Sequence, residues 1–329
     1  MPVRNVEGEL ESLAALCHAD AGETRTRALR RALNDKVNVI AAKAALLTAE
    51  FELKTLVPEL CVTFERLLKD PLKTDPQCWG KDAVAKALKD MGHDDSSIFL
   101  KGVHHVQLEP VWGGQEDTAA NVRSTCALAL LQCTDLTRED KLWHVMPLLT
   151  ERSPSLRKDA AAALESLEGR EAALLLRIKA RMGDEDATVT GQVLESLLRV
   201  ERDAAVPFVI EFLRSPKPEL REEAALALGA SRLATSVAAL KNAFGERHRL
   251  LDSETLCRAL SISRNEDAID FLLEVLRTGR PNDAQAALDA LTLYRDSTEV
   301  RSKIEQAVAN RTEGEIQREY KRAFEPRSS

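Results

Sequence analysis

The sequence predicts an all-α chain that folds as one α-solenoid of about eight stacked helix-turn-helix units. Two features of composition and one of pattern predict it. Apolar residues make up 44% of the 329 residues, but only 4% are aromatic, and the chain has just 14 Gly and 12 Pro. An apolar content drawn mainly from Leu and Ala, with few turn residues, favours helices over sheets. The third observation is an internal repeat at helical spacing.

The repeated segment is clearest in the second and third quarters of the chain. Its copies are VRSTCALALL (122–131), LRKDAAAALESL (156–167), VTGQVLESLL (189–198) and LREEAALALG (220–229). Its reference position falls, in steps of 31 to 34 residues, at Arg123, Arg157, Thr190, Arg221, Asp252 and Asp283, with weaker copies at Asn38 and Gly80. Small or aliphatic residues follow three, four and seven or eight positions later, which is the spacing of one helix face. Each copy therefore predicts a helix, called helix B.

A second amphipathic segment, helix A, lies between successive copies. Examples span 140–153, 171–186, 205–216, 236–248 and 268–279. Each is followed by a segment rich in Ser, Pro, Gly or Asp that can supply the N-cap or first-turn proline of the next helix. A single helix pair cannot bury its apolar face, whereas stacked pairs can.

These segments suggest one domain with distinct ends. We expect a single solenoid over 1–329, with an N-terminal cap over 1–19 and divergent, longer repeats over 20–117. Regular repeats then occupy 118–295, and cap helices followed by a tail occupy 296–329. The segment GEIQREYKRAF (314–324) is highly charged, as a cap that faces water should be.

One complete unit carries a family resemblance. SPKPELREEAALALGASRLATSVAALKNAF (215–244) resembles a HEAT repeat of the short type named after phycobilisome lyases, and 152–186 is similar to it. The resemblance is good over 118–295 and loose over 20–110. It implies a right-handed α-solenoid whose concave face, lined by helix B, binds other macromolecules. The repeat motif specifies architecture, so the resemblance assigns no catalytic residue.

The Arg of the motif has a structural interpretation. Arg123, Arg157 and Arg221 lie near the middle of the apolar arc of helix B. A charge at such a position must be paired or extend to the surface. We expect these three side chains to hydrogen-bond to turn carbonyls or to acids of neighbouring repeats, and so to stabilise the fold.

The opposite arc of helix B is the candidate binding surface. It contains five acidic residues, Asp159, Glu195, Glu222, Glu223 and Glu254, against two basic ones, Lys158 and Arg199. The whole chain has a formal net charge of −7, and binding to nucleic acid phosphates requires the reverse sign. This arc predicts a protein or peptide partner with basic character, not nucleic acid. An ordinary solvated face is the alternative.

Residues 92–118 interrupt the repeat. We expect helix A over 97–108 and a long connector over 109–118, where Gly113 and Gly114 turn the chain. Three interpretations of this segment stay open. In the first, Trp112 covers the edge of the core and Asp117 or Thr118 caps the next helix. In the second, Trp112 contacts a partner. In the third, His105 and Glu109 share a helix face and bind a metal, joined by Asp94, Glu116 or Asp117.

No catalytic motif was found in the sequence, which holds no nucleophile elbow, phosphate loop, Rossmann glycine triplet or His-Glu-x-x-His. None of the six histidines is followed by Glu, unlike the iron-binding pairs of deoxyhypusine-hydroxylase-like proteins. A DNA-alkylation glycosylase-like enzyme would have to use Trp112, Trp143 and Asp117, and a phycobilin-lyase-like enzyme or chaperone is the other alternative. A noncatalytic protein-interaction scaffold without cofactor or metal is the leading prediction.

Cysteine usage and hydropathy point to the cytoplasm. The six cysteines form no Cys-x-x-Cys pair and lie within helical patterns, as buried reduced thiols would. The N-terminal segment has acidic residues where a signal peptide is apolar, and the longest uncharged run is far shorter than a membrane span. We therefore expect a soluble cytoplasmic protein without membrane contact.

Overall fold

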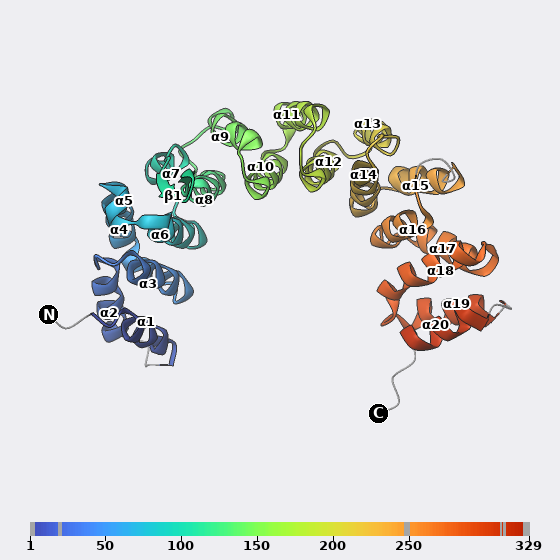
Figure 1. The fold of residues 1–329 in the computed structure, drawn as a ribbon, viewed down its shortest axis with the longest axis horizontal. Helices are drawn as coiled ribbons and strands as arrows, with labels where there is room; N and C mark the ends of the chain where they lie inside the picture. The colour runs from blue at the N-terminus through green and yellow to red at the C-terminus, as the bar shows by residue number, and fades with distance from the viewer. Residues whose placement is uncertain (1–3, 19–21, 247–250, 310, 312–313, 325–329) are drawn as a thin grey trace. The chain divides into compact units, whose positions relative to one another are not determined.

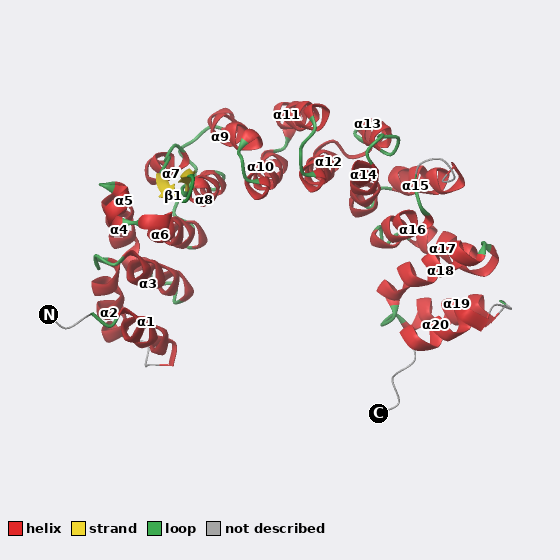
Figure 2. Cartoon of the chain, in the orientation of Figure 1, coloured by secondary structure: helices red, strands yellow, loops and turns green. Residues whose placement is uncertain are grey.

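The computed structural model describes residues 4–18, 22–246, 251–309, 311 and 314–324. These residues are almost entirely helical and contain one two-stranded hairpin (Figure 2). Contacts divide the chain into two compact units, 1–167 and 168–329, and each is described here by itself. The single domain over 1–329 stays a prediction, and the predicted tail at 325–329 lies outside the described residues.

Unit 1 consists of two layers of helices, preceded by α1 (Val6–Ala14) (Figure 1). The A layer contains α2 (Glu23–Leu33), α4 (Val57–Leu68), α7 (Ser96–Val103) and α9 (Arg138–Val145). The B layer contains α3 (Asn38–Glu50), α6 (Trp79–Asp90), α8 (Ala120–Leu130) and α10 (Pro154–Leu167). Each B helix packs against its A helix and against the next B helix. The short helix α5 (Pro71–Thr74) connects α4 to α6.

Unit 2 repeats the same two-layer arrangement (Figure 1). Its A layer contains α11 (Gly169–Met182), α13 (Val206–Phe212), α15 (Ala234–Glu246), α17 (Glu266–Thr278) and α19 (Thr298–Ala309). Its B layer contains α12 (Ala187–Glu201), α14 (Pro218–Ser231), α16 (Ser253–Ile262), α18 (Pro281–Leu291) and α20 (Gly314–Phe324). The described residues therefore form four helix pairs in unit 1 and five in unit 2, close to the predicted eight.

The helix starts follow the predicted capping signals. Pro154, Pro218 and Pro281 are the first residues of α10, α14 and α18, where the missing N–H costs nothing. The side chain of Asp186 accepts the N–H of Thr188 at 2.9 Å at the start of α12. The segments between the repeats therefore act as helix initiators, as expected.

Small residues set the spacing between B helices. In α14, Gly229 faces the backbone of Ala259 in α16 so closely that a Cβ would lie 2.9 Å from its carbonyl carbon. Ala224, Ala225 and Ala259 are fully buried or nearly so. Close approach of the backbones leaves little room for rings, which explains the low aromatic content. No helix within the described residues is long and apolar enough to cross a membrane.

The predicted helix over 97–108 is wrong in its second half. Helix α7 ends at Val103, and the connector forms the hairpin strands β1 (Leu108–Val111) and β2 (Gly114–Asp117). Pro110 lacks the N–H that a helix would need, which favours an extended strand. Gly113 has a φ of 91° and turns the chain together with Trp112, whereas Gly114, which was also predicted to turn the chain, is the first residue of β2.

Candidate functional site

The hairpin segment 106–112 exposes apolar side chains and buries polar ones. Leu108 is 49% exposed and Trp112 is fully exposed, whereas Gln107 and Glu109 are only 2% and 7% exposed. Alternate residues of an extended chain point to opposite sides, and a sheet that covers a core normally turns its apolar side inward. Here the apolar side faces solvent. We call its four residues the hairpin stripe: Val106, Leu108, Pro110 and Trp112.

The exposure of Trp112 decides between two of the earlier interpretations. The hypothesis that Trp112 covers the edge of the core is wrong, because its side chain is fully exposed. A contact of Trp112 with a partner stays a prediction. The N-cap of α8 is Ala119, and neither Asp117 nor Thr118 occupies that position. Asp117 instead lies two residues earlier, where its Oδ1 accepts the N–H of Ala119 at 3.1 Å.

Glu109 holds the polar side of the hairpin against helix α6. Its Oε1 accepts the backbone N–H of Gln77 at 2.6 Å, the amide of Gln107 at 2.6 Å and the hydroxyl of Thr118 at 2.8 Å. Burial acts to raise the pKa of Glu109, but hydrogen bonds from Thr118, Gln107 and Gln77 outweigh it and lower that pKa. The buried carboxyl is therefore an anion, and its hydrogen bonds explain why the hairpin buries its polar side.

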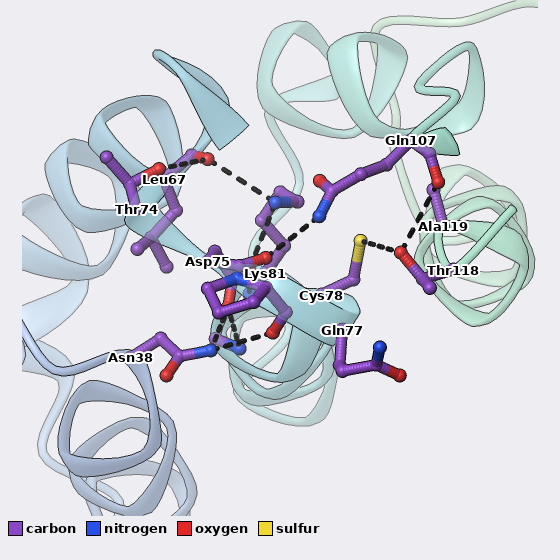
Figure 3. Close-up of polar contacts among 12 residues, drawn as sticks. Asn38, Leu67, Thr74, Asp75, Gln77, Cys78, Lys81, Gln107, Thr118 and Ala119 are labelled. Carbon is purple, nitrogen blue, oxygen red and sulfur yellow. Dashed lines mark hydrogen bonds and ion pairs between the residues drawn. The ribbon is translucent and has the colours of Figure 1, made fainter. Parts of the chain in front are cut away.

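A second anion, Asp75, anchors the same region to α6 (Figure 3). Asp75 and Lys81 have no exposed side-chain surface, and Lys81 Nζ lies 3.1 Å from Asp75 Oδ2. Asp75 Oδ1 accepts hydrogen bonds of 2.8 Å from Asn38 Nδ2 and from the N–H of Gly80. Gln107 Nε2 donates to the backbone oxygen of Asp75 at 3.0 Å. This buried network links α3, α6 and the hairpin.

Between Asp75 and α6 the backbone takes an unusual conformation. Gln77 and Cys78 have φ values of 62° and 57°, in the left-handed region that non-glycine residues occupy at a cost of about 1–2 kcal/mol each. This turn directs the N–H of Gln77 to Glu109. Cys78 Sγ lies 3.5 Å from the hydroxyl of Thr118, and burial raises the pKa of this thiol, which keeps it protonated.

A groove of about 630 Å³ runs beside the hairpin within unit 1. Its walls come from the turn before α6, strand β2, the start of α8 and the segment before α10. The lining side chains include a half-exposed Trp79, four carboxylates and two guanidinium groups. The charged residues are Asp82, Glu116, Asp117, Glu151, Arg123 and Arg152.

Arg123 forms ion pairs with two of these carboxylates. Its Nε donates to Glu151 at 2.7 Å, and its Nη1 lies 2.8 Å from Asp117 and donates to the backbone oxygen of His105 at 2.9 Å. Burial acts to lower the pKa of Arg123, but the hydrogen bonds that it donates to Glu151 and Asp117 raise it overall. This contact pattern confirms the predicted bonding of Arg123 and leaves the groove with surplus negative charge.

The two other motif arginines also bind turn carbonyls, as predicted. Arg157 Nη1 donates to the backbone oxygens of Glu151 and Arg152 at 2.6 and 2.7 Å. Arg221 Nη1 donates to that of Ser215 at 2.9 Å. These carbonyls belong to the turn that precedes the same helix and not to a neighbouring repeat. The predicted effect of both arginines on stability stays a prediction.

The acidic arc of helix B is only half-exposed, because most of its carboxylates contact other residues of the B layer. Ser124 Oγ donates to Asp159 at 2.9 Å between α8 and α10. Arg199 donates to Glu195 within α12, and Arg258 of α16 donates to Glu222 of α14. Asp159, Glu195, Glu222 and Glu223 are each half-exposed. These acids stay candidate partner contacts that are untested.

Glu254 is the exposed exception, and it lines a pocket of about 750 Å³ in unit 2. The pocket lies at the starts of α16 and α18. Its charged residues are Asp252, Glu254, Asp283, Asp289 and Arg280, so carboxylates again outnumber cations. Asp283 is buried and accepts a hydrogen bond from Ser253.

Comparison with known proteins supports the repeat architecture. Residues 174–251 match the sequence profile of HEAT repeats. This stretch consists of HEAT repeats. No curated protein matches the chain. The HEAT resemblance inferred from 215–244 is thereby confirmed over the matched residues, and the helix pairs of unit 2 give these HEAT repeats their predicted two layers.

The solved structures to which the chain is similar include two enzymes and an engineered protein. Human deoxyhypusine hydroxylase is 20% identical, with 80% of this chain and 92% of that chain covered and a TM-score of 0.30. The CpcE–CpcF complex of phycocyanin lyase from Nostoc sp. is 14% identical. The match covers 83% of this chain and 96% of that chain, with a TM-score of 0.40. An engineered protein is 17% identical. The match covers 96% of this chain and 98% of that chain, with a TM-score of 0.37. At these scores the likeness carries no conclusion about activity or partner.

The helix face with His105 and Glu109, the third interpretation of residues 92–118, does not form. His105 follows the end of α7 and Glu109 lies in β1, so they share no helix. His105 contacts Gln107 at 3.2 Å, and burial lowers the pKa of His105. Over the described ranges, no group of three His, Cys, Asp or Glu side chains is placed to hold a metal ion.

Sequence reasoning missed the buried pair that positions the hairpin beside the HEAT-like helices. Lys81 directly follows Gly80, the reference position of a weak repeat copy, and its ammonium reaches the backbone oxygen of Leu67 at 3.4 Å. It thus binds a backbone carbonyl at the end of α4, much as the motif arginines bind turn carbonyls. The signal was a lysine beside the reference position, together with an Asp-Pro pair at 75–76 just before the helix.

Proposed function

We propose that this chain is a noncatalytic scaffold that binds a protein or peptide partner through unit 1, at the hairpin stripe and the adjoining groove. The main support for this proposal is the exposed apolar side of the hairpin. Exposing Leu108 and Trp112 while burying Glu109 costs stability unless another surface covers the apolar side. Tryptophan is also the residue type most enriched at interaction hot spots.

The charge of the two pockets supports a partner with basic character. Carboxylates outnumber cations both in the groove of unit 1 and in the pocket that contains Glu254. Charge complementarity of this kind steers association and excludes partners of like charge. Nucleic acid phosphates would meet repulsion at both places.

The state of the polar groups at the groove supports binding over catalysis. Arg123 is held by Asp117 and Glu151, and Cys78 lies against Thr118 with a raised pKa. A catalytic group needs a pKa matched to its task and a reactive atom within reach of substrate. None of the six cysteines, all within the described residues, takes part in a disulfide, which supports a reducing, cytoplasmic setting.

The test compares two exposed leucines. The chain with Leu108→Ser and Trp112→Ser is used beside Leu293→Ser, since Leu108 and Leu293 are both 49% exposed. A partner is captured from an extract of the native source, purified, and titrated against each variant. We expect the hairpin variant to bind at least about tenfold more weakly, the loss of about 1.4 kcal/mol expected for a hot spot, and Leu293→Ser to bind normally. Equal binding by all three chains would remove the hairpin stripe from the interface.

A further inference from the structure

Strand β2 presents to the groove a backbone edge that no other described part of the chain pairs with. The N–H of Thr118 donates to the carbonyl of Gln107 at 3.0 Å, one step beyond the pair Leu108–Asp117. Opposite residues of an antiparallel ladder alternate between hydrogen-bonded and non-bonded pairs. The pairs of Leu108 with Asp117 and of Pro110 with Gln115 are therefore non-bonded pairs. Their backbone groups point away from the hairpin, toward a further strand on either side.

The two edges of the hairpin are not equivalent. On the edge of β1, Pro110 has no N–H to offer, as is common where a protein prevents strand addition. On the edge of β2, Gln115 and Asp117 keep both their N–H and C=O groups. The residues 115–118 line the groove, whereas no residue of β1 does. The open edge therefore faces the groove.

The carboxylates at this edge favour a cationic ligand. Glu116 is exposed and lies directly opposite Glu109 in the ladder. Like charges at directly opposite positions destabilise a strand pair. Glu109 is held as an anion by its three hydrogen-bond donors, so it cannot relieve the repulsion by taking a proton near neutral pH. Asp82 adds a further carboxylate to the groove wall.

We infer that the partner of the proposed function binds by strand addition. An extended segment of the partner pairs with the backbone of Gln115 and Asp117 and extends the hairpin to three strands. An Arg or Lys of that segment lies beside Glu116, in line with Glu109 across the sheet. Main-chain hydrogen bonds then supply affinity, and the basic side chain supplies specificity.

The first experiment reads the backbone pairing directly. A library of ten-residue synthetic peptides with a fixed central Arg is screened against the full chain by fluorescence polarisation. The strongest binder is then remade with a single N-methyl group at each successive backbone nitrogen. Strand addition predicts that N-methylation weakens binding about fivefold or more at every second position only, because alternate N–H groups face β2. Equal effects at adjacent positions would overturn the inference.

The second experiment changes the protein. Glu116→Gln should weaken the Arg peptide about five- to tenfold, while Glu139→Gln, an exposed carboxyl on α9 outside the groove, should leave it unchanged. Gln115→Pro removes an outward N–H that the hairpin does not use, and should weaken binding at least about fivefold relative to Gln115→Thr. Unchanged binding in Glu116→Gln would contradict the inference, and the peptide series decides it even if Gln115→Pro disturbs the hairpin.

The outcomes separate this inference from the proposed function. If the peptides bind without alternating sensitivity, strand addition is wrong and the scaffold proposal stands. If no peptide binds but a folded partner binds through the hairpin stripe, strand addition is again wrong. If neither peptide nor partner binds, both proposals fail.

Discussion

Lys81 and Asp75 form an ion pair that is wholly shielded from water, with Nζ 3.1 Å from Oδ2. The two backbone N–H groups at the start of α6 also point at Asp75: those of Gly80 and Lys81 each donate at 2.8 Å. A helix N-terminus favours a negative charge, so the anion is stabilised by both the ammonium and the helix. This pair holds the start of α6 and, through the backbone oxygen of Asp75, the hairpin.

Removing the charge of Asp75 should destabilise unit 1 strongly. In Asp75→Asn, the ammonium of Lys81 stays buried without its counter-ion. Breaking a buried ion pair in this way costs about 3–5 kcal/mol. We expect that loss in the free energy of unfolding, measured by urea denaturation at pH 7.

Two further variants test the reason for that loss. Asp75→Asn combined with Lys81→Met removes the unpaired charge and should recover at least half of the stability, as a double-mutant cycle would reveal. Asp70→Asn breaks an exposed pair with Lys73 and should change stability by less than about 1 kcal/mol. If Asp75→Asn were as mild as Asp70→Asn, the buried pair would not hold the fold.

The lowered pKa of Glu109 predicts a dependence of stability on pH. Its pKa in the folded chain lies below the ordinary value of 4.5, because hydrogen bonds to the carboxylate outweigh burial. The stabilisation is therefore fully present above about pH 4.5 and is lost as the pH falls through the lower folded pKa. The difference in unfolding free energy between wild type and Glu109→Gln should be constant from pH 7 to about pH 5 and shrink below that.

Urea titrations of both chains at a series of pH values measure this difference. Glu139→Gln serves as the matched control, since its exposed carboxyl should change stability by no more than about 0.5 kcal/mol at any pH. A difference for Glu109→Gln that grew on acidification would mean that the folded chain favours the protonated carboxyl, which contradicts the ionised network.

The helical fold could be predicted from the sequence, whereas of the candidate site the sequence suggested only a partner contact at Trp112, as one of three interpretations. Spacing of apolar residues in 122–131 and 220–229 is a local property, and it identified α8 and α14 within a few residues. The hairpin was missed because the sequence predicted a helix over 97–108 and only a connector over 109–118. Its polarity is set by Glu109, whose three donors come from segments up to 32 residues away. Such convergence leaves no periodic signal in the sequence.

Arg157 and Arg221 occupy the same motif position but should contribute unequally to stability. Arg157 is buried and donates short hydrogen bonds to two carbonyls. Arg221 also donates to two carbonyls, but at 2.9 and 3.3 Å; it is half-exposed, and its Nε has no partner among the described residues. Hydrogen bonds from a charged group are worth about 1.5–3 kcal/mol. We expect Arg157→Ala to lose about that much and Arg221→Ala less than half of it.

Thermal unfolding of both variants beside wild type tests the order. The expected result is a lower melting temperature for both, with the larger fall for Arg157→Ala. An unchanged melting temperature together with lost partner binding would show instead that these arginines belong to the interaction surface.

Gly229 should be irreplaceable even by alanine, because α14 and α16 meet there backbone to backbone. A Cβ at this position would clash with the carbonyl oxygen of Ala259 and lie 2.9 Å from its carbonyl carbon. Backbone atoms cannot swing aside as a side chain can, so the helices must separate, at a cost of about 1–3 kcal/mol. Gly245 in the last turn of α15 is the matched control, since a Cβ there meets nothing within 4 Å.

Opposite signs are expected for the two alanine variants in urea denaturation. Gly229→Ala should lower the free energy of unfolding, whereas Gly245→Ala should raise it by up to about 1 kcal/mol, because alanine restricts the unfolded chain and favours helix. If both variants were stabilising, the B helices could separate freely at Gly229. The close approach of α14 and α16 would then have no energetic importance, and the small residues of the repeat would need a different explanation from the spacing of the B layer.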